Sequence, residues 1–281
     1  MKINGKIIST RRKELGLTQQ ELAEGICNQA TISVLETKNA CDSMKILGEI
    51  CQRLKLTFDD VLEKSFDEKL RALLAKVIDL TSEFKFQEAY QLLEGISDVE
   101  EIENSDLKAE VYYNFGNINL VGFHEIDKAL YYFYEVSTMN VTQVMIKSLA
   151  INSIGVCYAQ KGEWEFARGH FDKSLQLIEE NPDFVTKNVS KIFYNVAKFY
   201  SSLGDFSRAV ALCDQGLELY KQFKSTSYLD FLYYEKAFNL QHLDEEKAKK
   251  YFALSAGIAE FNDNQFIIDT INSGQVNHLE G

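Results

Sequence analysis

The sequence predicts an all-α protein built in two parts, and three observations support this. The chain has 281 residues but a single proline, Pro182, whereas folds of strands and turns need many more such breakers. The formal charge of −12 is uneven, because residues 1–64 hold ten Lys/Arg against nine Asp/Glu and are close to neutral. Several segments of the acidic remainder resemble one another at a regular spacing. We therefore expect a near-neutral helical domain followed by an acidic array of helix pairs.

Composition and cysteine usage narrow the protein class. The 46% hydrophobic and 26% charged content is ordinary for a globular chain, and the acidic balance disfavours a general nucleic-acid coat protein. No apolar stretch of about 18 residues occurs, and the first ten residues lack the apolar core of a signal peptide. We expect a cytoplasmic protein with no membrane partner, cofactor or metal. The cysteines are widely spaced with no CxxC pair, which predicts reduced thiols; they are Cys27, Cys41, Cys51, Cys157 and Cys213.

Helix-start signals divide the first sixty residues into five short helices. Apolar spacing predicts a helix over residues 3–15, which Gly16 ends. Thr18 and Glu21 form a capping box for a second helix that runs through residue 23. Asn28 caps a third helix over residues 29–36. Ser43 and Thr57 cap the fourth and fifth helices. The tight turn between the second and third helices makes them a helix-turn-helix, whose second helix lies in the DNA major groove.

The segments GLTQQELA and NQATISVLE within residues 3–62 resemble the phage-repressor-like (Cro/C1, or XRE) family. The resemblance implies that Gln19 donates to a phosphate, and that Arg12 and Glu36 form a buried ion pair. It also implies that three residues of the third helix face base edges: Gln29, Ala30 and Ser33. Glutamine suits adenine, and an alanine can meet a thymine methyl. Two alternatives stay open, a phosphate contact for Arg12 and a merely solvated Gln29.

The expected recognition helix carries no Lys or Arg through Glu36, and Val34 stands where the family often has arginine. Contacts with the DNA backbone must then come from basic residues around it, which are Lys6, Arg11, Lys13, Lys38 and Lys45. A domain close to neutrality gains little from counterion release. We therefore expect weak binding by a monomer, and a homodimer on two half-sites of a double-stranded operator.

Internal similarity organises the remaining residues. Segments 148–178 and 190–220 each place a small residue, Gly155 or Ala197, twelve positions before an alanine, and a glycine-centred turn lies between. This is the pattern of tetratricopeptide (TPR) repeats, in which small residues let two helices approach closely. Weaker copies put the anchors of five repeats 39 to 42 residues apart, more than the usual 34, at positions 77, 116, 155, 197 and 237.

The weaker repeats depart from the pattern in length. Gly116 and Ala129 are thirteen positions apart, so their turn holds one extra residue, and Ala237 and Ala248 are eleven apart. Residues 258–271 are predicted to form a C-terminal capping helix. The domain boundaries expected from these patterns are a helix-turn-helix domain over 1–63, a linker helix over 64–70, the array over 71–273 and a tail over 274–281.

A TPR array coils into a right-handed superhelix whose first helices line a concave surface that commonly takes an extended peptide. Counting from the repeat anchors predicts which residues face that surface. An asparagine amide suits this role because it both donates and accepts, as a peptide backbone does. Alternatively, some of these asparagines are solvated or bridge neighbouring helices. The predicted peptide-binding residues are Tyr113, Asn117, Asn152, Lys191, Tyr194, Asn195, Lys198 and Glu235.

The combination of both parts resembles the Gram-positive quorum-sensing regulators of the Rap/NprR/PlcR/PrgX group, with the nearest likeness to its PlcR and TprA types. The segments LAEGICNQATISVLE, YNVAK and LYYEKAFNLQHL carry this resemblance. It implies a transcription regulator controlled by a short signalling peptide, which changes the pitch of the array and the spacing of two DNA-binding domains. By the same likeness, Asn152 and Asn195 hold the peptide backbone and Lys198 or Lys191 meets a carboxylate. Glu235 stands where the PlcR type has a glutamine, which favours a peptide with a basic or amide group at that point.

Three alternatives belong to other classes. An enzyme is disfavoured because the histidines are dispersed and no catalytic or phosphate-binding motif accompanies them; they are His124, His170, His242 and His278. A TPR adaptor for another protein remains open, as does a regulator that uses the array only to dimerise. The operator, the peptide sequence and the sign of regulation are left open by one sequence.

Overall fold

A computed structural model describes residues 2–63, 65–96 and 99–273 of the chain. It is 76% helical, and no strand occurs in these three ranges beyond two isolated bridges that Ala40 and Leu62 make with residues 2 and 3. The chain divides into two compact units between Leu70 and Arg71. Each unit has its own hydrophobic core, and the predicted all-α fold of a helix-turn-helix domain and a TPR-like array is confirmed.

The N-terminal unit contains the five predicted short helices. Thr18 accepts from the backbone of Glu21 in a complete capping box, and side chains also cap the next three helices. The first helix begins at residue 5, two residues later than predicted, because Ile3 pairs with Leu62 instead. The helices are α1 (Gly5–Glu14), α2 (Gln19–Ala23), α3 (Gln29–Lys38), α4 (Met44–Leu54) and α5 (Phe58–Val61).

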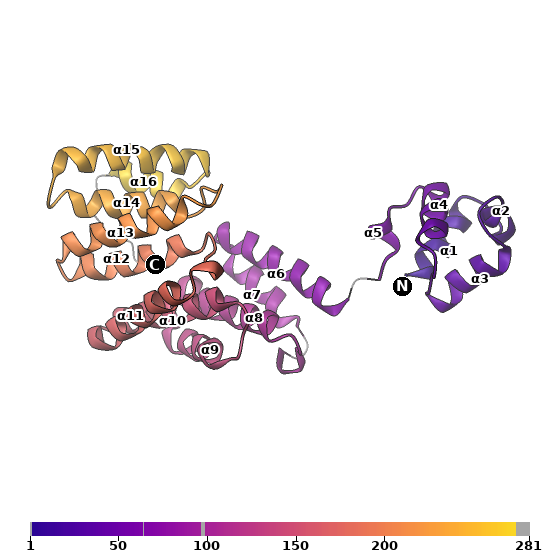
Figure 1. The fold of residues 1–281 in the computed structure, drawn as a ribbon, viewed down its shortest axis with the longest axis horizontal. Helices are drawn as coiled ribbons and strands as arrows, with labels where there is room; N and C mark the ends of the chain where they lie inside the picture. The colour runs from indigo at the N-terminus through magenta and orange to yellow at the C-terminus, as the bar shows by residue number, and fades with distance from the viewer. Residues whose placement is uncertain (1, 64, 97–98, 274–281) are drawn as a thin grey trace. The chain divides into compact units, whose positions relative to one another are not determined.

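The second unit is an array of antiparallel helix pairs (Figure 1). Its first helices are α6 (Phe66–Ser82), α7 (Phe86–Glu94), α8 (Ser105–Asn117) and α9 (Ile126–Thr138). The next four are α10 (Val144–Gln160), α11 (Trp164–Glu180), α12 (Val189–Ser202) and α13 (Phe206–Tyr220). The last three are α14 (Leu229–Leu240), α15 (Glu245–Phe261) and α16 (Gln265–Ser273). Two 3₁₀ turns, Val99–Glu101 and Pro182–Phe184, lie in the connections. Each of α8, α10, α12 and α14, here called the A helices, packs on the helix that follows it and on the neighbouring A helix.

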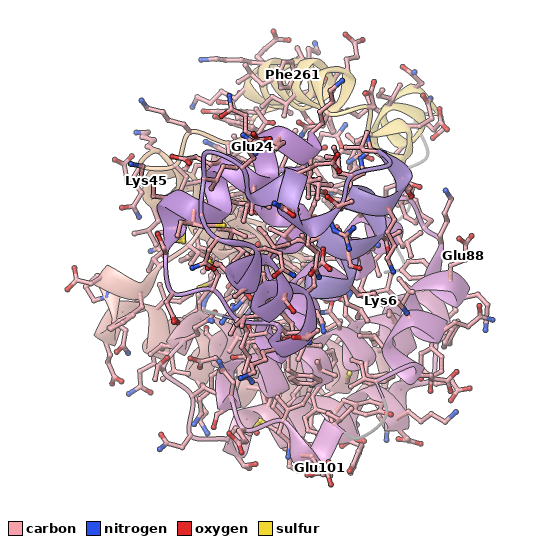
Figure 2. All side chains as sticks on the ribbon, turned by 90° about the vertical axis from the view of Figure 1, so that its right-hand side faces the viewer. Lys6, Glu24, Lys45, Glu88, Glu101 and Phe261 are labelled. Carbon is pink, nitrogen blue, oxygen red and sulfur yellow. The ribbon has the colours of Figure 1, made fainter. Side chains whose placement is uncertain are left out.

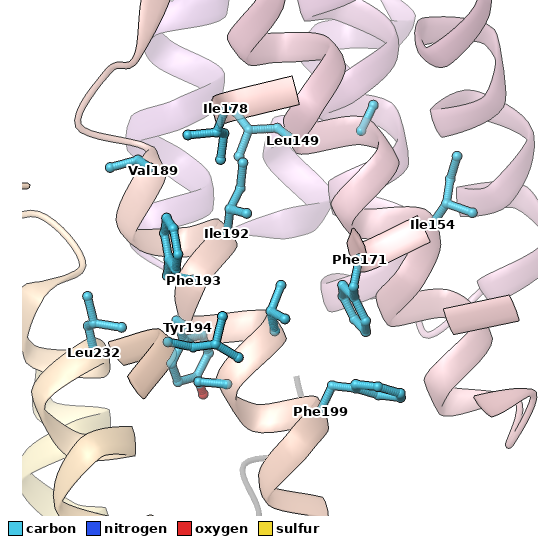
Figure 3. Packing of buried hydrophobic residues seen from close by; sticks show 14 of the residues in the cluster. Leu149, Ile154, Phe171, Ile178, Val189, Ile192, Phe193, Tyr194, Phe199 and Leu232 are labelled. Carbon is cyan, nitrogen blue, oxygen red and sulfur yellow. The ribbon is translucent and has the colours of Figure 1, made fainter. Parts of the chain in front are cut away.

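The predicted small-residue contacts join the two helices of a repeat. A Cβ added to Gly116 would lie 2.6 Å from the ring of Phe133, and one added to Gly155 would lie 2.8 Å from the ring of Phe171. Both phenylalanines are fully buried. Figure 3 shows Phe171 among the apolar side chains that fill the space between α10, α11 and α12. Glycine at these positions is therefore required for the helices to approach, as the repeat pattern predicts.

The extra residue between Gly116 and Ala129 forms a π-turn. Residues Ile118–Gly122 continue α8 as a π-helical segment, and His124 then takes a positive φ of 56° before α9. A π-turn holds one residue more than an α-turn. The insertion is thus absorbed between the two helices, and Gly116 and Ala129 both stay buried.

Two sequence-based boundaries differ from the structure. The capping helix predicted over 258–271 is wrong in its start, because α15 runs to Phe261 and α16 begins only at Gln265. Between them, Asp263 adopts a left-handed φ of 54°. The segment expected as a separate linker helix over 64–70 belongs from Phe66 onward to the continuous 17-residue helix α6. Residue 64 and the expected tail over 274–281 lie outside the described residues.

Candidate nucleic-acid interface and polar stripe

The first two turns of α3 hold the residues expected to read DNA. Gln29 and Ala30 are exposed, whereas Ser33 is half-buried. Asn28 fixes the start of this helix, because its side-chain oxygen accepts from Thr31 N at 2.8 Å. Val34 is 41% exposed, so the surface of α3 offers apolar and amide contacts rather than positive charge.

A hydrogen-bonded chain of side chains connects the expected reading residue to the core of the N-terminal unit. Gln29 Nε2 donates to Gln19 Oε1 at 2.6 Å, and Gln19 Nε2 donates to Glu36 Oε2 at 2.8 Å. Arg12 holds the same carboxylate from the other side through Nε at 2.6 Å and Nη2 at 2.9 Å. The two glutamine amides are therefore oriented by a bidentate ion pair between α1 and α3.

The electrostatics of this ion pair are those of a structural contact. Burial by itself raises the pKa of Glu36, but hydrogen bonds from Arg12 and Gln19 outweigh it and leave that pKa below its ordinary value. The hydrogen bond to Glu36 likewise raises the pKa of Arg12. Arg12 also donates to the carbonyl of Leu17 at 2.7 Å, so its guanidinium is held within the unit rather than presented to a phosphate.

The basic residues expected at phosphates fall into two groups. Arg11 is partly engaged by its own unit, because Nε donates to the Leu54 carbonyl at 3.2 Å and Nη1 pairs with the exposed Glu14 at 2.8 Å, but its side chain is still 36% exposed. The others are exposed, and Figure 2 labels two of them well apart; they are Lys6, Lys13, Lys38 and Lys45. Sequence reasoning missed Arg53, which donates to three carbonyls at the end of α2 and holds that helix in place.

The expected peptide-binding residues lie on the A helices, where they form a polar stripe: Tyr113, Asn117, Asn152, Lys191, Tyr194, Asn195, Lys198 and Glu235. The centre of this polar stripe is a pair of amides, because Asn195 Nδ2 donates to Asn152 Oδ1 at 2.8 Å. Asn152 is 1% exposed, and its own Nδ2 lies 3.4 Å from Ser174 Oγ and 3.5 Å from the Ile192 carbonyl. Asn152 therefore bridges neighbouring helices. Of the two asparagines, Asn195 is the one that is accessible, because it is half-buried.

One end of the polar stripe is cationic. Lys191 Nζ donates to Tyr113 Oη at 3.1 Å and to Asn117 Oδ1 at 3.0 Å. The ammonium also lies 5.5 Å from the ring centre of Tyr113 and 5.9 Å from that of Tyr228. Burial lowers the pKa of Lys191, but the two tyrosines outweigh that effect and leave it raised, so the side chain is charged at neutral pH. These residues come from α8, the start of α14 and the first turn of α12.

The other end of the polar stripe is acidic. Glu235 is 3% exposed, and its Oε1 accepts from Asn239 Nδ2 at 2.8 Å. Burial raises the pKa of Glu235 to about 7, although Asn239 and the nearby charge of Lys198 both oppose the rise. The buried Oδ1 of Asn239 has no hydrogen-bond partner among the described residues. Two buried acceptor groups thus lie at this end, and one of them, Asn239, was not predicted.

An aromatic group adjoins the polar stripe. The ring of Tyr194, labelled in Figure 3, lies 5.6 Å from Phe231 and 6.4 Å from Tyr228. Burial and the charge of Glu235 raise the pKa of Tyr194 well above its ordinary value, so it is a neutral hydrogen-bonding group. Tyr228 and Phe231 were missed because they lie in and just after an irregular loop, where repeat counting gives no position.

In the described part of the chain, no group of three or more His, Cys, Asp or Glu side chains is arranged to hold a metal ion. None of the helices there has both the length and the apolar character needed to cross a bilayer.

Family models match both units. A helix-turn-helix model matches residues 8–61, and the model of the RNPP family C-terminal domain matches residues 120–269, more than half of the chain. The chain belongs to the RNPP family. It is thus a relative of transcription regulators and carries their helix-turn-helix domain. The matched region contains most of the polar stripe. No curated protein matches the chain.

Solved structures share the fold over almost the entire chain. Bacillus thuringiensis PlcR, in complex with the peptide PapR7 and DNA, matches with a TM-score of 0.65 and 20% identity, over 95% of this chain and 98% of PlcR. Its apo form matches with a TM-score of 0.64 and 15% identity, over 96% and 99%. The competence regulator ComR from Streptococcus vestibularis, in its apo form, has a TM-score of 0.53 and 14% identity, over 99% and 98%.

Proposed function

We propose that this RNPP-family regulator binds a double-stranded operator as a homodimer and is controlled by a short peptide bound along the polar stripe. The observation that carries the proposal is the accessible Asn195 amide, held by the buried Asn152 between a cationic and an acidic end. A peptide backbone alternates donors and acceptors, and an oriented amide matches both. The likeness to PlcR, which was solved with a peptide and DNA, supports the same reading.

On the DNA side, the first turn of α3 is the reading element. Gln29 is exposed and presents an amide that can bond the N6 and N7 edge of adenine, while the neighbouring Ala30 can meet a thymine methyl. Gln19 supports Gln29 and reaches a phosphate from the start of α2. Phosphate contacts come from the exposed lysines and from Arg11, which must give up its surface pair with Glu14 to make one. One domain therefore binds weakly, and two half-sites are needed.

Peptide control requires a difference in affinity. A ligand shifts an equilibrium only by binding one arrangement of the protein more tightly than another. Asn152 and Asn195 join α10 to α12, so a peptide that bonds Asn195 acts on the contact between two successive repeats. A change at that contact alters the pitch of the array and the spacing of two DNA-binding domains in a dimer.

The proposal is tested with the full-length chain and two random pools. Double-stranded DNA selected from a random pool should contain two related half-sites. A pool of synthetic heptapeptides should then change the affinity for that DNA. Asn195→Ala should remove the peptide effect and leave DNA affinity without peptide unchanged, whereas the control Asn188→Ala, at an exposed residue before α12, should keep it.

Three results would contradict the proposal in different ways. If no peptide changes the affinity for DNA and the protein is dimeric by light scattering, the array serves only for dimerisation. If the peptide effect persists in Asn195→Ala, the peptide binds somewhere other than the polar stripe. If no DNA sequence is enriched from the pool, the protein is not a sequence-specific DNA-binding regulator.

A further inference from the structure

Lys191 is a half-buried cation whose partners are all neutral. Its two hydrogen bonds go to the Tyr113 hydroxyl and the Asn117 amide oxygen, and its two ring contacts are with Tyr113 and Tyr228. Within the described residues, Lys191 forms no ion pair with a carboxylate. The two buried cations among the described residues are both paired with acids, Arg12 with Glu36 and Lys236 with Asp214. An unpaired charge removed from water is costly, so a site that keeps one is suited to an anionic ligand.

The groups around Lys191 can complete such a site. An ammonium has three hydrogens, and Tyr113 and Asn117 accept two of them. The Tyr113 hydroxyl accepts from Lys191, which leaves its own hydrogen to donate to a second oxygen. Lys191 also lies in the first turn of α12, where the helix dipole favours negative charge. A planar carboxylate, with two oxygens to place, matches this set of donors.

Tyr228 covers the ammonium in a strained conformation. Its φ is +63°, in the left-handed region that bulky residues rarely adopt. The loop before it is held by two contacts, because Tyr220 Oη donates to the Ser227 carbonyl at 2.9 Å and the Thr226 side chain bonds Asn262. The ring itself stacks on Phe231 at 4.9 Å. Backbone strain that the surroundings impose is concentrated at ligand clamps and switch regions.

We propose that Lys191 receives a carboxylate of the bound peptide and that Tyr228 is the clamp residue over it. This rests on the proposed function and adds the chemistry and direction of the ligand. It also separates the two lysines that the sequence left as alternatives, since Lys198 faces Glu235 and Lys191 faces no acid. Seven helical residues separate them, about 10 Å along α12, which three extended peptide residues span. The carboxylate of the peptide lies at Lys191, and a hydrogen-bond donor of the peptide lies near Glu235.

The carboxylate has two sources, the peptide's C-terminus or an Asp/Glu side chain, and one experiment separates them. Two pools of synthetic heptapeptides, identical except for a free or an amidated C-terminus, are incubated with the full-length protein, and retained peptides are identified by mass spectrometry. A C-terminal carboxylate gives about tenfold or greater enrichment of free acids over amides. A side-chain carboxylate gives equal retention of both pools, with Asp or Glu fixed at one position.

Lys191→Met is the variant, because methionine keeps the chain length and removes the charge. It should reduce either preference to within about twofold, while the control Lys187→Met, at an exposed lysine, keeps it. Lys191→Met should also melt no lower than the native chain without peptide, since an unpaired charge is lost. Tyr228→Gly should weaken retention of the favoured pool, because it removes the ring that covers the ammonium while Lys191 itself stays in place.

The outcomes are distinct. Retention of both pools with no carboxylate preference, or a preference that survives in Lys191→Met, overturns the subsite and leaves the proposed function standing. Retention of no peptide from either pool overturns both. If Lys191→Met does not fold, the comparison of the two pools on the native protein decides the question alone.

Discussion

The two units handle buried polar groups differently. In the N-terminal unit, the buried charges of Arg12 and Glu36 neutralise each other and orient two glutamines. In the array, Lys191 is held by neutral oxygens and Glu235 has a pKa raised to about 7 by burial. The first arrangement is a closed ion pair, whereas in the second Lys191 has no acidic partner and Glu235 has the nearby charge of Lys198. The difference separates charges that neutralise each other from charges held mainly by neutral groups, and the proposed peptide would use the second kind.

Side-chain caps are more regular in the N-terminal unit than in the array. In the N-terminal unit, side chains cap α2, α3, α4 and α5, and only α1 begins without such a cap. In the array, side chains cap α8, α13 and α15, whereas α7, α9, α10, α11, α12 and α14 begin without a side-chain cap. The uncapped helices must be stabilised mainly by packing. Loss of a cap should therefore matter most in the N-terminal unit, and loss of a packing contact most in the array.

The largest expected effect is at the completed ion pair. Arg12→Ala should destabilise the N-terminal unit by about 3–5 kcal/mol, because it leaves the Glu36 carboxylate buried and unpaired. Denaturation of the full-length chain, with hydrogen exchange of α1 and α3, measures the loss. The double variant Arg12→Met/Glu36→Leu should recover most of it. If the double variant recovers none of the lost stability, the Arg12–Glu36 pair contributes more than mutual neutralisation of two charges.

The next effect concerns Glu235, whose burial makes the stability of the array depend on pH. Glu235 has an ordinary pKa of 4.5 when unfolded and about 7 when folded, so below pH 4.5 both states are protonated and no penalty arises. As pH rises from 4.5 to about 7, the unfolded chain releases its proton first, and stability falls by up to about 3 kcal/mol. Glu235→Gln should flatten this dependence and stabilise the chain at pH 8.

Urea unfolding at pH 5, 6, 7 and 8 measures this dependence. The control is Glu179→Gln, at an exposed glutamate of α11, which should follow the native curve. Parallel pH curves for the native chain and Glu235→Gln would show that Glu235 is not the group responsible.

A smaller loss of stability is expected when a close helix contact in the array is disturbed, and a second glycine of the same repeat provides the control. Gly155→Ala should destabilise the array by about 1–3 kcal/mol, because the new methyl group meets the buried ring of Phe171 at 2.8 Å. Gly169→Ala has nothing within 4 Å and lies inside α11, so it should stabilise by about 0.5–1 kcal/mol. Thermal unfolding of both variants compares them, and shifts of the same sign would contradict the repeat contact.

The smallest effect is at a local cap. Thr18→Ala removes the capping box of α2 and should cost the N-terminal unit about 1 kcal/mol. Gln20→Ala, at an exposed position of the same helix, serves as the control and should have little effect. Equal losses in the two variants, measured by hydrogen exchange of α2, would show that the cap contributes nothing.

The sequence predicts features that depend on near neighbours or on a repeated contact. Helix starts can be predicted from capping residues, because a cap depends only on the next three residues; these are Thr18, Asn28, Ser43 and Thr57. The close helix contact at Gly155 can be predicted because the same spacing recurs in other repeats. Most of the fold follows from these two signals. The start of α16 does not, since the apolar pattern of residues 258–271 continues across the turn at Asp263.

The partners in the candidate site are harder to predict. Lys191 bonds Tyr113, 78 residues away in sequence, and rests against Tyr228 from an irregular loop. Side-chain type and helix face identify which residues point to the polar stripe, but they do not determine which residue touches which. The burial of Asn152 is a case in point, because its neighbours Ser174 and Ile192 belong to two different helices.

The π-turn at Ile118–Gly122 bears on how such an array can diverge. One inserted residue is taken up within a single turn, and the packed glycine before it and the packed alanine after it keep their places. Repeats of unequal length can therefore coexist in one array. The length of this turn can differ by one residue without displacing the contact between α8 and α9, so the position of the polar side chains on α8 does not depend on every repeat having the same length.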